Sequence, residues 1–299
     1  MRITITGATG FIGSRLVQHW LQETHELHAL GRNAGKLPPA VRFWKWDEPE
    51  RTAPPLESLE GSDAVVHLAG EPVAQRWTQE AKQRIRASRI DVTGNLVRAI
   101  SQLQRKPSVL ISGSAVGYYG SRGDEVLTED SAPGRGFLPD LCVEWERRAQ
   151  QAAASGLRVV CLRTGIVLGV GGGALAQMLT PFRLGIGGPL GTGEQWMPWI
   201  HAEDIVGLID FALKTEGVQG PLNGCAPNPL TNREFSSQLG RALHRPAVVP
   251  MPAFAMKLLF GEMAQVIVAS DRMLPKAALA AGYAFHFPEL CAALNQLLR

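Results

Sequence analysis

The chain has 299 residues, of which 45% are hydrophobic and 19% are charged, and its formal net charge is +3. This is the composition of an ordinary globular protein with its own core. It argues against a nucleic-acid-binding protein, because no stretch concentrates lysine and arginine. The four cysteines are isolated, which argues against a zinc site or a disulfide framework and predicts reduced thiols in a cytoplasmic protein. No apolar run reaches the roughly 18 residues of a membrane helix, and we expect no signal peptide because a strand pattern begins at once.

The first 165 residues alternate between strand and helix patterns. β-branched residues alternate with others over residues 2–6, and apolar residues at helical spacing follow from Phe11. Further strands are predicted at 27–30, 41–44, 63–68, 108–112 and 157–162, and helices at 79–103 and 139–154. This order predicts βαβ units, and so an α/β fold: a Rossmann-type, doubly wound parallel sheet with helices on both faces.

The pattern changes after Gly165. Residues 169–193 are rich in glycine and contain two prolines, which is typical of loops and tight turns. Short helices are predicted at 203–214, 231–243, 253–260, 274–281 and from Pro288 onward. We therefore expect a Rossmann domain over residues 1–165, to whose sheet residues 195–225 return. Residues 166–299 then form a smaller, mostly helical substrate-covering region with a helical tail over 248–299.

The strongest local signal is the sequence Gly7-Ala8-Thr9-Gly10-Phe11-Ile12-Gly13, between the first strand and the first helix. Gly7 allows a tight turn, Gly10 lets the backbone approach a pyrophosphate, and Gly13 lets the helix pack closely on the strand. The helix N-terminus then offers free N–H groups to the phosphates. The loop therefore predicts a dinucleotide-binding site.

The end of the second strand predicts which dinucleotide is bound. Domains specific for NAD place an Asp or Glu there to bind the ribose 2′-hydroxyl, but this chain has Arg32. A guanidinium suits the 2′-phosphate of NADP(H) instead. The alternative is that Arg32 is an exposed, solubilising side chain.

The motifs together resemble those of extended short-chain dehydrogenase/reductases. The glycine spacing, Leu68-Ala69-Gly70 after the fourth strand and Ser112-Gly113-Ser114 at the end of the fifth all match landmarks of that class. More narrowly, residues 68–72, 112–120 and 142–146 are similar to an epimerase-family branch of it. The resemblance extends over essentially the whole chain and implies the fold, NADP(H) as cofactor, and Leu68, Ala69 and Gly70 lining the adenine and ribose side. The expected cofactor contacts are Gly7, Thr9, Gly10, Phe11, Ile12, Gly13, Arg32, Leu68, Ala69, Gly70, Glu71 and Ser112.

One departure from that class affects the mechanism. Its members use a Tyr-x-x-x-Lys motif on the helix after the serine, where the lysine lowers the pKa of the tyrosine so that it can exchange a proton. On the corresponding helix of this chain, Leu138 and Cys142 stand about where the tyrosine and lysine would be. Tyr-x-x-x-Lys occurs nowhere in the sequence, so the resemblance does not extend to the usual proton relay.

Other residues are candidates for the chemistry. Ser114 matches the serine that binds a substrate carbonyl or hydroxyl, and Ser112 is expected to meet the cofactor or the backbone. Tyr118 or Tyr119 could act as the acid, although an unassisted tyrosine has a pKa near 10 and either ring could simply pack in the core. Glu71 lies at the carboxyl edge of the sheet, where ligands bind.

Several further residues have both a functional and a structural interpretation. Cys142 is a nucleophile only beside a base, and a core thiol otherwise. His201 is expected to have a structural role, and residues 196–199 either line a substrate pocket or pack in the core. Basic and aromatic candidates on the side of Glu71 are Arg76, Trp77 and Arg89, and Arg183 could meet an anionic substrate.

Two functions compete. The first is an NADP(H)-dependent oxidoreductase or epimerase acting on a small-molecule carbonyl or nucleotide-sugar-like substrate. The second is a non-catalytic NADP(H)-binding regulator, because some members of the branch carry a cell-division label. We expect no metal, no nucleic acid and no membrane as partners. The class often forms homodimers through the helices that correspond to residues 79–103 and 139–154.

Overall fold

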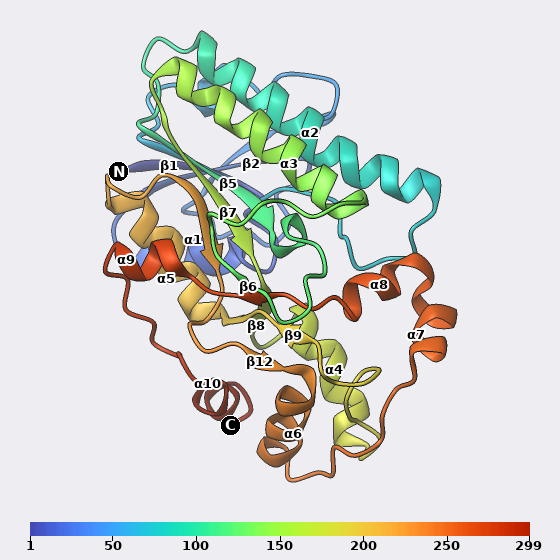
Figure 1. Cartoon of the computed structure of the whole chain (residues 1–299). Coiled ribbons are helices and arrows are strands. Elements are labelled where there is room, and N and C mark those ends of the chain that lie inside the picture. Colours follow the sequence, from blue (N-terminus) through green and yellow to red (C-terminus); the bar gives the residue numbers. More distant parts are fainter.

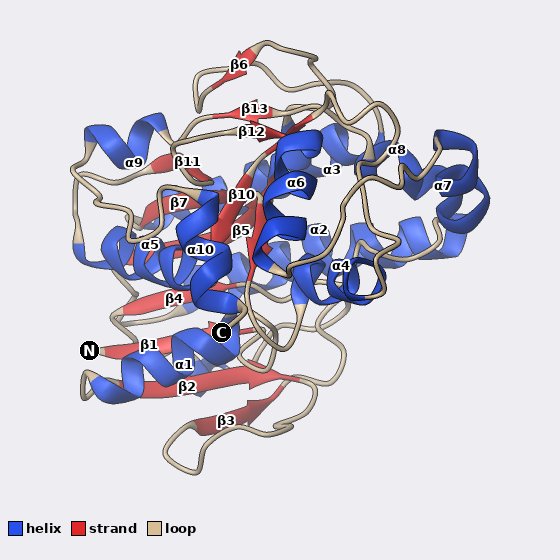
Figure 2. Ribbon diagram, turned by 90° about the horizontal axis from the view of Figure 1, so that it is seen from below, coloured by secondary structure: helices blue, strands red, loops and turns tan.

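A parallel sheet of seven strands forms the centre of the molecule. The structure is a computed structural model that describes residues 1–299, apart from the side chains of Ala253, Leu259 and Phe260. The strands are β1 (Arg2–Thr6), β2 (Glu26–Gly31), β3 (Arg42–Lys45), β4 (Ala64–His67), β5 (Val109–Ala115), β7 (Arg158–Thr164) and β11 (Gly220–Gly224). They pair in the order β11-β7-β5-β4-β1-β2-β3, and every neighbouring pair is parallel (Figure 2). The predicted Rossmann-type sheet is confirmed.

Helices cover both faces of this sheet. The pair α2 (Gln79–Gln102) and α3 (Phe137–Gln150) lies side by side over one face (Figure 1), while α1 (Gly13–Gln22) and α5 (Ala202–Lys214) pack on the other. Each face has its own hydrophobic cluster, so the central strands are buried on both sides. All four residues of β4 are buried, which explains why Ala64, Val65 and Val66 form an apolar run in the sequence.

The strand order reverses at β1, which places a crevice at its carboxyl end. From β1 the sheet continues through β2 and β3 in one direction and through β4, β5, β7 and β11 in the other. In open α/β sheets, ligands bind where the order reverses, outside the carboxyl ends of the strands. The loops after β1, β2, β4 and β5 therefore border the candidate site.

The second half of the chain forms a smaller lobe beyond this edge. Its helices are α4 (Gly173–Arg183), α6 (Asn232–Ala242), α7 (Ala253–Phe260), α8 (Ala264–Ile267) and α10 (Leu290–Leu297), whereas α9 (Lys276–Ala280) packs beside β11 on the α1/α5 face of the sheet. Short ladders join β8 (Ile166–Leu168) to β10 (Trp199–His201), β9 (Trp196–Met197) to β12 (Leu230–Thr231), and β6 (Val126–Leu127) to β13 (Arg272–Met273). Turns of 3-10 helix are η1 (Leu56–Ser58), η2 (Val116–Tyr118), η3 (Gln151–Ser155) and η4 (Gly261–Met263).

Residues 169–193 differ from the prediction, because α4 forms inside a stretch expected to be loop. Between the glycines, residues 174–180 include strong helix formers, and Leu175 and Phe182 bury one side of the helix. The glycines before the helix allow a close approach: a Cβ on Gly172 would lie 2.7 Å from the ring of Phe11. These glycines therefore indicate tight packing against the loop after β1 in addition to turns. Among the described residues, no helix is both long enough and apolar enough to cross a membrane.

Candidate functional site

The loop after β1 is a cradle built from glycines. Gly7 has a φ of +74°, and a Cβ there would lie 2.8 Å from the backbone nitrogen of Ala69. A Cβ on Gly13 would overlap the carbonyl oxygen of Gly7, so only glycine lets α1 start this close to the turn. No side chain caps the start of α1, where Ile12 is the N-cap residue. This bare helix N-terminus is suited to phosphate groups.

The loop after β2 lies against this cradle and carries Arg32. Gly35 packs on Thr9, because a Cβ on Gly35 would lie 3.2 Å from the Thr9 methyl carbon. Arg32 is exposed, and no described residue forms an ion pair or hydrogen bond with its side chain. Its guanidinium is therefore free to meet a ligand.

Behind the crevice, a buried polar row ties β1 to β4. His67 Nδ1 lies 2.6 Å from the Thr6 hydroxyl, and its Nε2 lies 3.0 Å from the Thr93 hydroxyl. Burial lowers the pKa of His67 to about 4, and the positive charge of Arg89 acts in the same direction. His67 is thus a neutral structural histidine. It was not singled out by the sequence, where the only signal was a polar residue inside an apolar strand.

The loop after β4 is fixed by α2. The backbone N–H of Glu71 donates to Ser88, and Arg89 Nη1 donates to the Glu71 carbonyl oxygen at 3.0 Å. The Glu71 side chain is half-buried and accepts from Gln75, with Arg84 at 3.5 Å. Glu71 therefore lies at the edge of the crevice, as its sequence position suggested.

The end of β5 carries Ser114, which is only 5% exposed. Its hydroxyl donates to Glu146 of α3 at 2.6 Å, and Arg163 of β7 donates to both oxygens of the same carboxylate at 2.9 Å. Ser112 is fully buried and donates weakly to the carbonyl oxygen of Gly113. The Ser114 hydroxyl thus belongs to a polar network within the protein, and its contact with a substrate stays a prediction.

The positions of the missing proton relay are apolar in the structure. Leu138 packs against the backbone of Gly117: a Cβ on Gly117 would lie 3.1 Å from the Cβ of Leu138. Cys142 is buried, and burial raises the pKa of its thiol to about 12. A thiol with that pKa stays protonated at neutral pH, so Cys142 is a core residue and not a nucleophile.

The two neighbouring tyrosines have different roles. Tyr119 is fully buried, donates to Asn223 Oδ1 at 2.6 Å and accepts from Arg163. Burial raises the pKa of Tyr119 to about 12, although Arg163 opposes the rise, so this phenol is structural. Tyr118 is half-buried, with its ring 3.4 Å from the guanidinium carbon of Arg163, and no described residue bonds its hydroxyl. Tyr118 is therefore the tyrosine with a hydroxyl available to a ligand.

The remaining candidates are mostly structural. His201 caps α5 by accepting from the Glu203 backbone N–H and also lies 3.1 Å from Gln296. Trp199 is a core residue, whereas Trp196 is half-buried beneath Arg272 and donates to Asp124. The Glu146–Arg163 pair was not predicted from the sequence, in which its only signal is an arginine near the end of an apolar strand.

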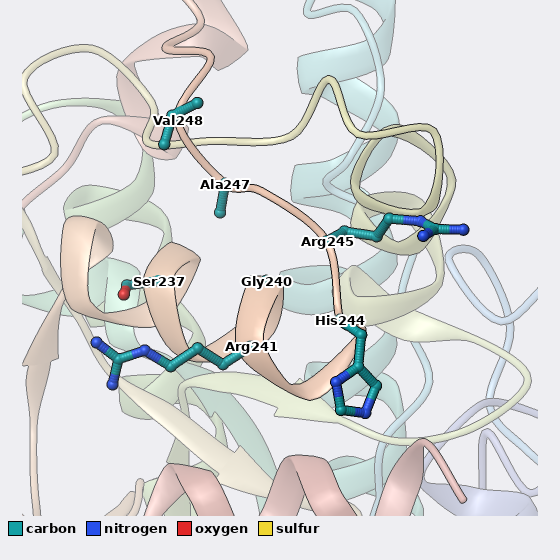
Figure 3. Close-up of a pocket in the computed structure, with 7 residues that line it drawn as sticks. All are labelled: Ser237, Gly240, Arg241, His244, Arg245, Ala247 and Val248. Carbon is teal, nitrogen blue, oxygen red and sulfur yellow. The ribbon is translucent and has the colours of Figure 1, made fainter.

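A cavity of about 460 Å³ lies apart from this site, between the end of α6 and the link that follows it. Its polar lining includes Arg241, His244 and Arg245. Figure 3 shows these side chains pointing in different directions, and Arg245 donates to the backbone of Arg183 outside the cavity. The basic groups do not converge on one ligand position.

Comparisons with known proteins agree with this geometry. Residues 3–223 match the NAD dependent epimerase/dehydratase family, and residues 251–297 match a domain of unknown function. The human epimerase family protein SDR39U1 is 38% identical, with all of both chains covered, and the Bacillus subtilis epimerase family protein YfhF is 38% identical over all of this chain and 98% of its own. A crystal structure of human SDR39U1 (isoform 2) with NADPH has a TM-score of 0.90 at 37% identity, covering 100% of this chain and 99% of that one.

Proposed function

The chain belongs to the NAD dependent epimerase/dehydratase family, and from this premise we propose that it is an NADP(H)-dependent oxidoreductase or epimerase. Its substrate would be a carbonyl or nucleotide-sugar-like compound. The observation that supports this most strongly is the glycine cradle after β1, where side chains at Gly7 and Gly13 would collide with the backbone. Such a cradle beside a bare helix N-terminus suits a pyrophosphate.

The preference for NADP(H) is assigned to Arg32. Its exposed, unpaired guanidinium follows β2 and lies on the loop that packs against Thr9. A charge-assisted hydrogen bond to a 2′-phosphate contributes about 1.5–3 kcal/mol, which corresponds to a roughly ten- to hundredfold preference over NAD(H). The human relative with a TM-score of 0.90 was solved with NADPH, which supports the same choice.

When bound, NADP(H) would supply or accept the hydride at the carbon that bears the reacting oxygen. The protein must then move a proton at that oxygen, and we assign this step to the hydroxyl of Tyr118. Tyr119 and Cys142 are excluded from the step because both are buried, and the Tyr119 hydroxyl already bonds Asn223 and Arg163. Arg163 and Tyr119 hold the Tyr118 ring in place through stacking and edge contacts. Because Ser114 donates its hydroxyl proton to Glu146, it would accept a hydrogen bond from a substrate hydroxyl at the same position.

The test is to follow NADPH absorbance with a broad panel of carbonyl substrates. Turnover by the wild type that falls at least about tenfold in Tyr118→Phe and Ser114→Ala supports the assignment, because a positioned proton donor contributes roughly 10²–10⁴-fold. Tyr283→Phe is the matched control, because its hydroxyl bonds Asp204 and the ring packs on the α1/α5 face of the sheet. Unchanged turnover in Tyr118→Phe would exclude that residue as the acid.

A second function, a non-catalytic NADP(H)-binding regulator, is favoured by the apolar side chain of Leu138 in the place of a catalytic tyrosine. It predicts tight NADPH binding with no turnover of any carbonyl in the panel. If NADPH fails to raise the melting temperature, both functions are excluded in favour of a scaffold that binds no cofactor. We also propose a cytoplasmic location and a homodimer formed through α2 and α3; the mass of the protein in solution tests the dimer.

A further inference from the structure

A group of exposed apolar side chains lies at one end of the second lobe. Large apolar residues scattered singly over a surface are ordinary, but several together mark a binding surface. Of the described large apolar side chains that are at least 60% exposed, all but Val170 belong to this group. The group is called the apolar surface below, and its members are Leu184, Ile186, Val248, Val249, Phe254 and Leu258.

Two segments that are distant in the sequence bring the first four of these side chains together. The chain after α4 runs beside the link between α6 and α7. The Val249 N–H donates to the carbonyl oxygen of Gly187 at 3.3 Å, and the Met251 N–H donates to that of Pro189 at 3.0 Å. The exposed residues of the two segments are therefore neighbours in the folded protein.

Helix α7 extends the apolar surface beyond this link. It begins directly after the link and lies at the same end of the molecule as α4 in both overall views (Figures 1 and 2). Phe254 and Leu258 are four residues apart, so they share one face of the helix, and they are 76% and 78% exposed. Met256 is fully buried on the other face and holds α7 against the protein. The exposed face of α7 has no partner among the described residues.

The charge around the apolar surface has one sign. The chain contains neither Asp nor Glu over residues 147–193, nor over residues 235–261. The carboxylates that border these segments are already paired: Glu194 with Arg233, Glu234 with the Thr231 cap, and Glu262 with Lys82. Four exposed cations remain beside the apolar surface, and none of them forms an ion pair with a described residue: Arg183, Arg241, Arg245 and Lys257. The apolar surface therefore complements an anionic partner.

We propose that the apolar surface docks on an anionic lipid bilayer. Phe254 and Leu258 would enter the boundary between the head groups and the acyl chains, while the flanking cations meet lipid phosphates. Protruding apolar side chains with basic neighbours suit this boundary, because apolar burial and attraction to anionic lipids then act together. Such a contact lies on the membrane surface and needs no spanning helix, so the sequence-based expectation of no membrane partner then holds for a spanning contact alone. The proposal does not depend on NADP(H) binding.

The test is co-sedimentation of the purified protein with large vesicles, made either of phosphatidylcholine or of equal parts of phosphatidylcholine and phosphatidylglycerol. We expect the wild type to bind the mixed vesicles at least about tenfold more tightly than the neutral ones, and added salt to weaken this binding. The double variant Phe254→Ser with Leu258→Ser should bind the mixed vesicles about tenfold more weakly or worse, because it buries less apolar surface. The double variant Arg183→Gln with Lys257→Gln should lose about fivefold per cation removed.

Matched controls are available on exposed positions elsewhere. Leu279→Ser changes a leucine that is 49% exposed on α9, and Lys106→Gln changes an exposed lysine before β5, at the amino edge of the sheet. Both should bind like the wild type. Circular dichroism checks that each variant folds, and the charge variant keeps the experiment decisive if the serine variant does not.

Three results would overturn the proposal. The first is equal binding of the wild type to the two kinds of vesicle. The second is a loss in the folded Phe254→Ser, Leu258→Ser variant that is no larger than the loss in Leu279→Ser. The third is a wild type that binds neither kind of vesicle; if the same double variant then halves the mass of the protein in solution, the apolar surface belongs to a contact between two copies of the chain.

Discussion

Replacing Glu146 by alanine is expected to lower the free energy of unfolding by about 3–5 kcal/mol, because it leaves a buried guanidinium without a counter-ion. Arg163 donates to both oxygens of this carboxylate, and the two side chains are 4% and 12% exposed. Burial by itself would lower the pKa of Arg163, but the bonds to Glu146 hold that pKa above its usual value. Ser114 loses its hydrogen-bond acceptor in the same variant.

Urea denaturation followed by circular dichroism at neutral pH measures this loss. Glu144→Ala is the matched control on the same helix, since Glu144 pairs with the partly exposed Arg147 and Arg148 and should cost less than about 1 kcal/mol. The double variant Glu146→Leu with Arg163→Met should recover much of the stability, because two apolar side chains leave no buried charge. If Glu146→Ala lowers the free energy of unfolding no more than Glu144→Ala does, the buried pair does not hold β5, α3 and β7 together.

Two further predictions concern packing and pH. Gly172→Ala should destabilise the protein by about 1–3 kcal/mol in the same assay, because its methyl group meets the Phe11 ring at 2.7 Å, whereas Gly217→Ala, with no atom within 4 Å, should change little. Burial raises the pKa of Asp271 from 3.8 to about 7, so the folded protein holds this proton more tightly than the unfolded chain does. Stability should therefore fall as pH rises from about 4 to about 7, by at most about 1.4 kcal/mol per pH unit. Asp271→Asn should remove this decline, and a slope unchanged in that variant would contradict the assignment.

The fold was predictable because its signals are local. Buried parallel strands give short apolar runs, and each run is followed by residues at helical spacing, so the alternation alone predicts the sheet. The strand predicted over residues 108–112 extends to Ala115, because Ser112, Gly113 and Ser114 continue the pairing with β7. Polar residues near the end of a strand concealed this extension. Helix α4 was missed for a similar reason, since the glycines around it resemble those of a loop.

The candidate site was predictable only in part. The glycine loop depends on the spacing of nearby residues, which a sequence displays directly. The network of Ser114, Glu146 and Arg163 joins three elements that are distant along the chain, and only the folded structure brings them together. The difference between Tyr118 and Tyr119 is likewise a matter of burial, which two adjacent identical residues do not reveal in sequence.

The most direct test of the central claim is a titration of the wild type and Arg32→Ala with NADPH and NADH. We predict that the wild type prefers NADPH by about ten- to hundredfold, and that Arg32→Ala loses most of this preference while its affinity for NADH stays nearly the same. Equal losses for the two cofactors in Arg32→Ala, or a wild type that binds neither, would contradict the assignment of this crevice to NADP(H).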